Sequence, residues 1–334
     1  MTATETQIAF LDAGRGRIVV RGYDLTELAQ RAHYADVAYL LIHGSLPGPG
    51  KRSMFANALG DGAMLPRAMQ HVVEALPRRM PPLDALRTGI SALAGFEPPE
   101  LLEDPGRGAT VTKGVRILSA APTIVANAYR AGHDLPPAEP EHDLSYPARF
   151  LRMIPGAATD DEAVAIFDRV LSCHAEHEPA GATLAARAVA SAGGDIYGAV
   201  TAAAATLRGH LHDGEIEDAA HRVDPRAALL HVDLLTLAAR RDDGAAHVTA
   251  YGRAAEVMQR ETSLFPGADL PSTLILYLLD IPLELFAPIF LCARTAGLVA
   301  HVIEQHGDGI SPLRMRYAGP GDLHLPQDFV PAPL

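Results

Sequence analysis

Residues 209–227, GHLHDGEIEDAAHRVDPRA, gather side chains that can do chemistry in a chain otherwise rich in alanine. They comprise His210, His212, His221, Arg222 and Arg226. An imidazole exchanges protons near neutral pH, and a guanidinium presents a planar fork of donors that suits a carboxylate. This segment therefore predicts a site that binds a small anionic molecule and moves protons on it.

A second pair of histidines, His174 and His177, stands in the sequence HAEHE. Residues three apart lie on the same side of a helix, so both imidazoles can face one cleft. Three interpretations remain open at this point: core or capping histidines, a metal pair, or a substrate site. This segment lacks the His-Glu-x-x-His order of zinc proteases, so the spacing alone does not indicate zinc.

Taken together, these segments resemble those of the citrate synthase and 2-methylcitrate synthase family. The stretch 174–214, HAEHEPAGATLAARAVASAGGDIYGAVTAAAATLRGHLHDG, is similar to the family's HADHE motif, alanine-rich helix and LHGG turn. Further similar segments follow in order on both sides: RGYDLTELAQ, DVAYLLIHGSLP, DALRTGISAL, APTIVANAYR and DLSYPARFLRM upstream, and LFAPIFLCARTAGLVAHVIEQ downstream. The resemblance spans nearly the whole chain.

The resemblance implies an all-α fold with citrate-synthase-like large and small helical domains and a small N-terminal β-hairpin. Residues 1–208 and 286–334 would form the large domain, and 209–285 a shortened small domain. Members of the family are homodimers that bind a 2-oxo dicarboxylate such as oxaloacetate in a cleft. By motif, the substrate-binding residues are His177, Arg226, Arg294 and, reaching the site from the partner subunit, Arg314, with Arg316 as the alternative to Arg314.

Three further residues match the family's catalytic positions. His212 matches the LHGG histidine that hydrogen-bonds the thioester carbonyl, His221 resembles the histidine of GFGHRVY, and Asp269 matches the base of PNVDFYS. Joining a carbon nucleophile to a ketone needs a base for an α-proton, a donor for the enolate oxygen and a donor for the ketone oxygen. Asp269, His212 and His221 suit those roles in turn, so we expect an acyltransferase that forms a carbon–carbon bond.

The chain departs from the family between two of these residues. Only DGEIEDAA separates His212 from His221, where the family has a long helical insert ending in a Gly-rich loop. In the family that loop holds the adenine of coenzyme A. We therefore expect the acceptor half of the site to be retained and the coenzyme half to be rebuilt. No tightly bound cofactor is expected, and the donor is an acyl-CoA or a replacement for it.

Arg294 has two interpretations, a structural ion pair or a ligand for a substrate carboxylate. Gly297 and His301 lie three and seven positions further on, so they share its helical face. The neighbouring Phe290 and Leu298 leave little water for an isolated guanidinium. This context favours substrate binding.

The elements that must position these residues are mostly helices. The sequence has helical periodicity with breaks at Gly and Pro, and the main alternating stretch, 8–24, suits a hairpin. Asp24 is expected to cap a helix beginning at Leu25, and Gly44 to close the next helix. The helix over 284–305 is apolar on most sides, which we interpret as the subunit interface of an obligate homodimer.

Composition argues against several classes of function. The 334 residues are 48% hydrophobic, enough for a large core, and the net charge of −12 with scattered basic residues argues against nucleic-acid binding. The N-terminus lacks a basic stretch followed by an apolar run, and prolines and charges interrupt 270–303, so we expect neither secretion nor a membrane span. Cys173 and Cys292 are expected to be buried free thiols in a cytoplasmic protein.

Two other functions compete with the synthase. One is a non-catalytic binding or regulatory protein of the same fold, which would have no reason to keep Asp269 and His212 beside the arginines. The other is a metal-dependent hydrolase or lyase built on His174, His177, Glu178 and His212. Metal analysis of the purified protein separates this second alternative from the synthase.

Overall fold

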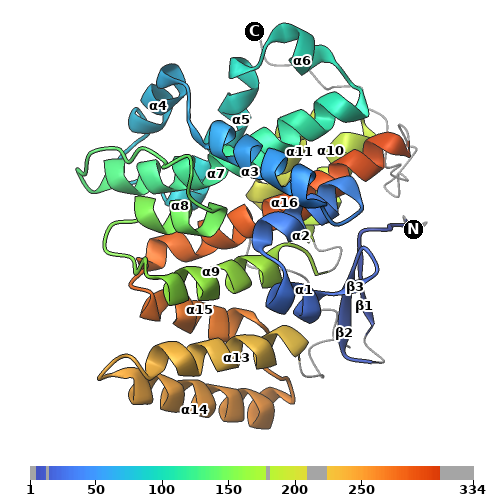
Figure 1. The fold of residues 1–334 in the computed structure, drawn as a ribbon. Coiled ribbons are helices and arrows are strands. Elements are labelled where there is room, and N and C mark those ends of the chain that lie inside the picture. Colours follow the sequence, from blue (N-terminus) through green and yellow to red (C-terminus); the bar gives the residue numbers. More distant parts are fainter. Residues whose placement is uncertain (1–4, 13–14, 178–180, 209–223, 309–334) are drawn as a thin grey trace, which may run out of the picture.

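The structure, a computed structural model, describes residues 5–12, 15–177, 181–208 and 224–308 (Figure 1). These residues form a helical fold with one small sheet near the N-terminus, so the predicted fold class is confirmed. Several residues singled out in the sequence lie outside the described ranges: Glu178, His210, His212, His221, Arg222, Arg314 and Arg316.

The N-terminal sheet consists of three antiparallel strands, β1 (Ala9–Asp12), β2 (Arg17–Val20) and β3 (Tyr23–Asp24). The β1–β2 hairpin confirms the prediction for 8–24. The short strand β3 is an addition to it, because Val20 pairs with Ala9 on one side and with Tyr23 on the other. Val20 is fully buried, so the sheet is anchored to the main core at this position.

Both predicted helix ends are present. The Asp24 carboxylate caps α1 (Leu25–Arg31) by accepting hydrogen bonds from the backbone N–H groups of Thr26 and Glu27, which the first helical turn leaves without partners. Helix α2 (Tyr34–His43) closes at Gly44, whose φ of 84° is a left-handed conformation that glycine adopts without strain.

The main body is built around α16 (Phe286–Gly307), which runs through the middle of the fold (Figure 1). The other helices of this body are α3 (Pro49–Ala63), α4 (Arg67–Glu74), α5 (Pro82–Leu93), α6 (Pro99–Glu103), α7 (Arg107–Gly132), α8 (Tyr146–Met153), α9 (Asp161–His174), α10 (Gly181–Ser191) and α11 (Ile196–Thr206). A short 3₁₀ turn at Ala94–Phe96 follows α5, and another at Leu283–Leu285 leads into α16.

The burial of α16 corrects one interpretation of the sequence. Among the described residues, the segment Leu283–Gly307 is long and apolar enough to cross a membrane, and 89% of its most apolar stretch is buried inside the fold. Its contacts include α2, α7, α9, α10 and α11 of the same chain. The apolar sides that we interpreted as a subunit interface are therefore covered by the subunit itself. Helix α16 is a core helix, and the homodimer stays a prediction without this argument.

Three helices form a layer toward the lower edge of Figure 1: α13 (Pro225–Ala238), α14 (Gly244–Thr262) and α15 (Asp269–Leu278). Arg169 of α9 ties this layer to the main body. Its guanidinium donates to both carboxylate oxygens of Asp233 on α13, with N–O distances from 2.7 to 3.1 Å. The layer lies within the small domain predicted over 209–285, and the division into two domains stays a prediction.

Candidate active site

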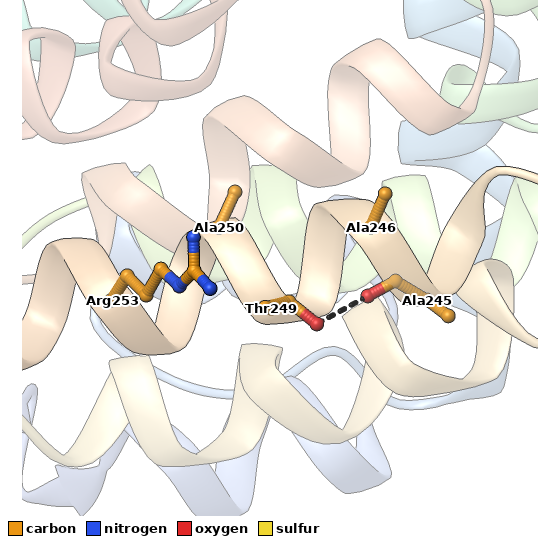
Figure 2. A pocket seen from close by; sticks show the side chains of 5 residues that line it. All are labelled: Ala245, Ala246, Thr249, Ala250 and Arg253. Atoms are coloured by element: carbon orange, nitrogen blue, oxygen red, sulfur yellow. Dashed lines mark hydrogen bonds between the residues drawn. The ribbon is translucent and has the colours of Figure 1, made fainter.

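The outer face of α14 carries a shallow hollow whose described lining lacks the side chains expected of a catalytic site. Figure 2 shows its lining, which is Ala245, Ala246, Thr249, Ala250 and Arg253 of this one helix. The Thr249 hydroxyl donates to the Ala245 carbonyl of the same helix at 2.8 Å. Among the described residues, the lining includes no carboxylate and no imidazole, so the candidate site lies elsewhere.

A cavity of about 260 Å³ lies where the end of α9 and the starts of α10, α15 and α16 meet. Its polar lining is His174, His177, Asp269 and Arg294, and its apolar lining is Ala182, Leu207, Ala287 and Phe290. The structure thus brings together three of the predicted site residues, His177, Asp269 and Arg294, from segments far apart in the sequence. His174 and His177 both line this cavity, as predicted, but not as residues of one helix, because α9 ends at His174 and His177 lies beyond it.

His174 connects the end of α9 to the start of α15. Its imidazole is buried, with Nε2 at 2.8 Å from the Ser272 hydroxyl and Nδ1 at 3.8 Å from Oδ1 of Asp269. The ring also packs against Phe290, with ring centroids 4.6 Å apart. These contacts fix His174 beside the carboxylate. Among the described residues no group of three side chains is suited to a metal ion, and Glu178 and His212 of the hydrolase alternative lie outside these residues.

Asp269 is the first residue of α15, and its side chain is 81% exposed. The helix starts here because Pro271 occupies the first turn, where a missing N–H costs nothing. The preceding residue is held in place, since the backbone N–H of Ala268 donates to Oδ2 of Asp224 at 2.9 Å. The carboxylate of Asp269 is therefore held on a fixed turn, beside the cavity and open to a substrate.

Arg294 forms a structural ion pair and also lines the cavity, and its binding of a substrate carboxylate stays a prediction. It lines the cavity, and its Nη2 also lies 3.2 Å from Oε1 of Glu176, whose side chain is fully buried. Burial opposes the charge on Glu176, yet Arg294 and His301 lower the pKa of this carboxyl to about 2. Gly297 and His301 do share a face with Arg294, as predicted, and both lie against Glu176.

Arg226 is largely enclosed, with 12% of its side chain exposed, and is not among the residues that line the cavity. Its guanidinium forms an ion pair with Asp224 at 2.8 Å and donates to the Cys173 carbonyl at 3.3 Å. Burial lowers the pKa of Arg226, but Asp224 and then Asp269 outweigh burial and raise it. The predicted carboxylate fork is thus engaged by its own chain.

Sequence reasoning missed Glu176 and Ser272. Glu176 is the middle residue of HAEHE, and its position between two histidines is the signal by which it could have been found. Ser272 lies one helical turn after Asp269 and gave no signal of its own. Cys173 and Cys292 are free and buried, as predicted, and burial raises the pKa of Cys173 to about 12.

Comparison with known proteins identifies the family. The family model "Citrate synthase, C-terminal domain" matches residues 1–223 and 219–316. A citrate synthase from Heyndrickxia coagulans is 36% identical over 97% of this chain and 95% of its own length. The chain belongs to the citrate synthase family. A citrate/2-methylcitrate synthase from Bacillus subtilis (strain 168) is 33% identical over 95% of this chain and 94% of its own length.

The fold of the family agrees with the structure described above. A crystal structure of citrate synthase from Pyrobaculum aerophilum superposes with a TM-score of 0.86 at 27% identity, covering 98% of this chain and 93% of that one. The predicted membership of the citrate synthase family is confirmed, and so is the predicted enzyme class, an acyltransferase of the citrate synthase type. The non-catalytic alternative is not favoured, because these relatives are named as synthases.

Proposed function

We propose that the protein condenses an acyl thioester with oxaloacetate or a close 2-oxo dicarboxylate, forming a carbon–carbon bond. The observation that carries this proposal is one cavity, in a citrate synthase fold, lined by Asp269, His177 and Arg294. A cavity of about 260 Å³ suits a four-carbon acid, and Arg294 and His177 offer it cationic and polar partners.

The chemistry divides among few residues. Asp269 removes a proton from the carbon next to the thioester carbonyl, and His212 donates a hydrogen bond to the resulting enolate oxygen. The enolate carbon attacks the ketone carbon of oxaloacetate, and His221 protonates the new alkoxide. Water then cleaves the thioester, releasing a thiol and the tricarboxylate. The roles of His212 and His221 rest on their motifs, and that of Asp269 also on its place at the cavity.

The direct test combines purified protein, oxaloacetate and acetyl-CoA or propionyl-CoA. We expect thiol release that depends on both substrates, together with a rise in melting temperature on addition of oxaloacetate alone. Pyruvate is the matched control, because it lacks the second carboxylate and should neither stabilise the protein nor react. Equal rates with pyruvate and oxaloacetate would contradict a dicarboxylate acceptor.

We also propose that the coenzyme half of the site is rebuilt. The two segments matched by the family model overlap at 219–223, a range that includes His221 and the end of the shortened stretch between His212 and His221. The alignment with the Heyndrickxia coagulans protein spans 360 positions, more than the 334 residues of this chain, so this chain lacks residues that the relative has.

The rebuilt donor site predicts a weak dependence on the nucleotide end of coenzyme A. We expect kcat/KM for acetyl-pantetheine to lie within about tenfold of that for acetyl-CoA, because remote binding energy contributes to catalysis only where the protein contacts the remote group. Steady-state rates with both thioesters provide the measurement. Saturation by acetyl-CoA at low micromolar concentration, with acetyl-pantetheine nearly inert, would show that an adenine site persists.

We further propose a cytoplasmic homodimer in which Arg314, or Arg316 in its place, completes the partner's site. Mixing inactive Arg314→Ala and Asp269→Asn subunits should then restore about a quarter of the activity, because half of the dimers are hybrids with one intact site. Sedimentation of the wild type provides the accompanying measurement. A monomer at micromolar concentration would contradict a site shared between subunits. So would a failure to recover activity when Asp269→Asn subunits are mixed with either the Arg314 or the Arg316 variant.

A further inference from the structure

Glu176 holds two residues of the cavity at once. Its Oε1 lies 3.2 Å from Nη2 of Arg294 and accepts the backbone N–H of His177 at 2.9 Å. Its Oε2 lies 3.3 Å from Nε2 of His301. Because Arg294 and His177 line the cavity, one buried carboxylate contacts two of its residues.

A series of polar contacts leads from His301 to the N-terminal segment. Nδ1 of His301 lies 3.3 Å from Nη1 of Arg187 on α10, which forms an ion pair with Glu304 at 2.6 Å. Glu304 in turn accepts the backbone N–H of Gln7, just before β1, at 2.9 Å. The contacts of Glu176 are therefore braced by α16, by α10 and by the segment that precedes the sheet.

Stability of the fold does not by itself explain a charge at this position. A buried ion pair is often no more stabilising than well-packed apolar residues of similar volume. Space has nevertheless been made for the carboxylate, because a Cβ on Gly297 would lie 2.3 Å from Oε2 of Glu176 and 2.6 Å from the Ala175 carbonyl. Glycine at this turn of α16 is what lets Glu176 approach.

Glu176 is also unsuited to proton transfer. Its side chain is fully buried and is not part of the cavity lining. Its low pKa keeps it ionised at neutral pH, so it neither donates nor stores a proton there. Its effect on a substrate must therefore pass through the residues it contacts.

We propose that Glu176 is a positioning residue for acceptor binding: it fixes the direction of the Arg294 guanidinium and the backbone of His177. This inference rests on the proposed function, because it assumes that the cavity takes a dicarboxylate. The chain has a glutamate where the family's HADHE motif has aspartate, so Glu176→Asp is the conservative variant and Glu176→Gln removes the charge.

The experiment compares these two variants with the wild type. We expect KM for oxaloacetate to rise about tenfold in Glu176→Gln and about threefold in Glu176→Asp, since one charge-assisted contact is lost or lengthened. The kcat and the KM for the thioester should stay within about twofold. Calorimetric titration with oxaloacetate gives the same comparison without turnover.

A double-mutant cycle shows whether Glu176 acts through Arg294. Glu176→Gln should raise KM for oxaloacetate less in the Arg294→Lys background than in the wild type, because both changes disturb one contact. Additive effects, or a lower kcat at unchanged KM, would overturn the positioning role. If Glu176→Gln does not fold, the same cycle with Glu176→Asp decides. Absence of oxaloacetate binding to the wild type would overturn the proposed function instead.

Discussion

Replacement of Asp269 by asparagine is expected to lower kcat by about 10²–10⁴-fold, the contribution typical of a general base. Asparagine keeps the size and the place of the side chain but cannot take the α-proton from the thioester. The side chain is 81% exposed, so the melting temperature should hardly change. Steady-state assays with oxaloacetate and the best thioester donor provide the measurement.

The matched control for this variant is Asp280→Asn. Asp280 follows α15 in a left-handed conformation, with φ of 58°, which asparagine also adopts readily. Its carboxylate is an exposed partner of Arg241 at 2.7 Å, away from the cavity lining. We expect full activity in this variant. Activity of Asp269→Asn within threefold of the wild type would show that another group takes the proton.

Replacement of Arg294 by lysine is expected to raise KM for oxaloacetate by about 10–150-fold, equivalent to about 1.5–3 kcal/mol for one charge-assisted hydrogen bond. Lysine retains the positive charge but loses the planar fork that binds a carboxylate through two donors. We prefer lysine to alanine here, because alanine would leave Glu176 buried without its ion pair and destabilise the fold.

Arg169→Lys is the control for Arg294→Lys. Arg169 also binds a carboxylate through two donors, but its partner Asp233 joins α9 to α13 outside the cavity lining. This variant should lose some thermal stability and keep its KM for oxaloacetate. If both lysine variants shift KM equally, the effect of Arg294 is a general loosening of the structure and not acceptor binding.

Local signals in the sequence were sufficient for the ends of elements. The cap at Asp24, the closure at Gly44 and the hairpin within 8–24 each depend on a few adjacent residues. The long apolar helix shows the limit of such signals. Apolar residues on all sides of 284–305 indicate burial, but they do not indicate whether the same chain or a partner covers the helix. The structure shows the same chain.

The candidate site was likewise predicted only in part from the sequence. His177, Asp269 and Arg294 were identified through motifs and are found at one cavity. The ion pair from Glu176 to Arg294 joins distant segments, and nothing in either segment specifies the other. Arg226 was matched to a substrate arginine, but a helix N-terminus places it two residues after a capping aspartate, and Asp224 takes its donors. The sequence DPR was a local indication of that contact.

The position of α16 gives the two walls of the cavity unequal mobility. Its backbone amides are enclosed by neighbouring helices, so they exchange hydrogen with solvent only when the core opens, which requires nearly the full free energy of unfolding. The side chain of Asp269, on the first residue of α15, is instead mostly exposed, and an exposed side chain changes rotamer within nanoseconds. The helix that carries Arg294 thus stays rigid on the timescale of turnover, while the Asp269 carboxylate can adjust to the reacting carbon.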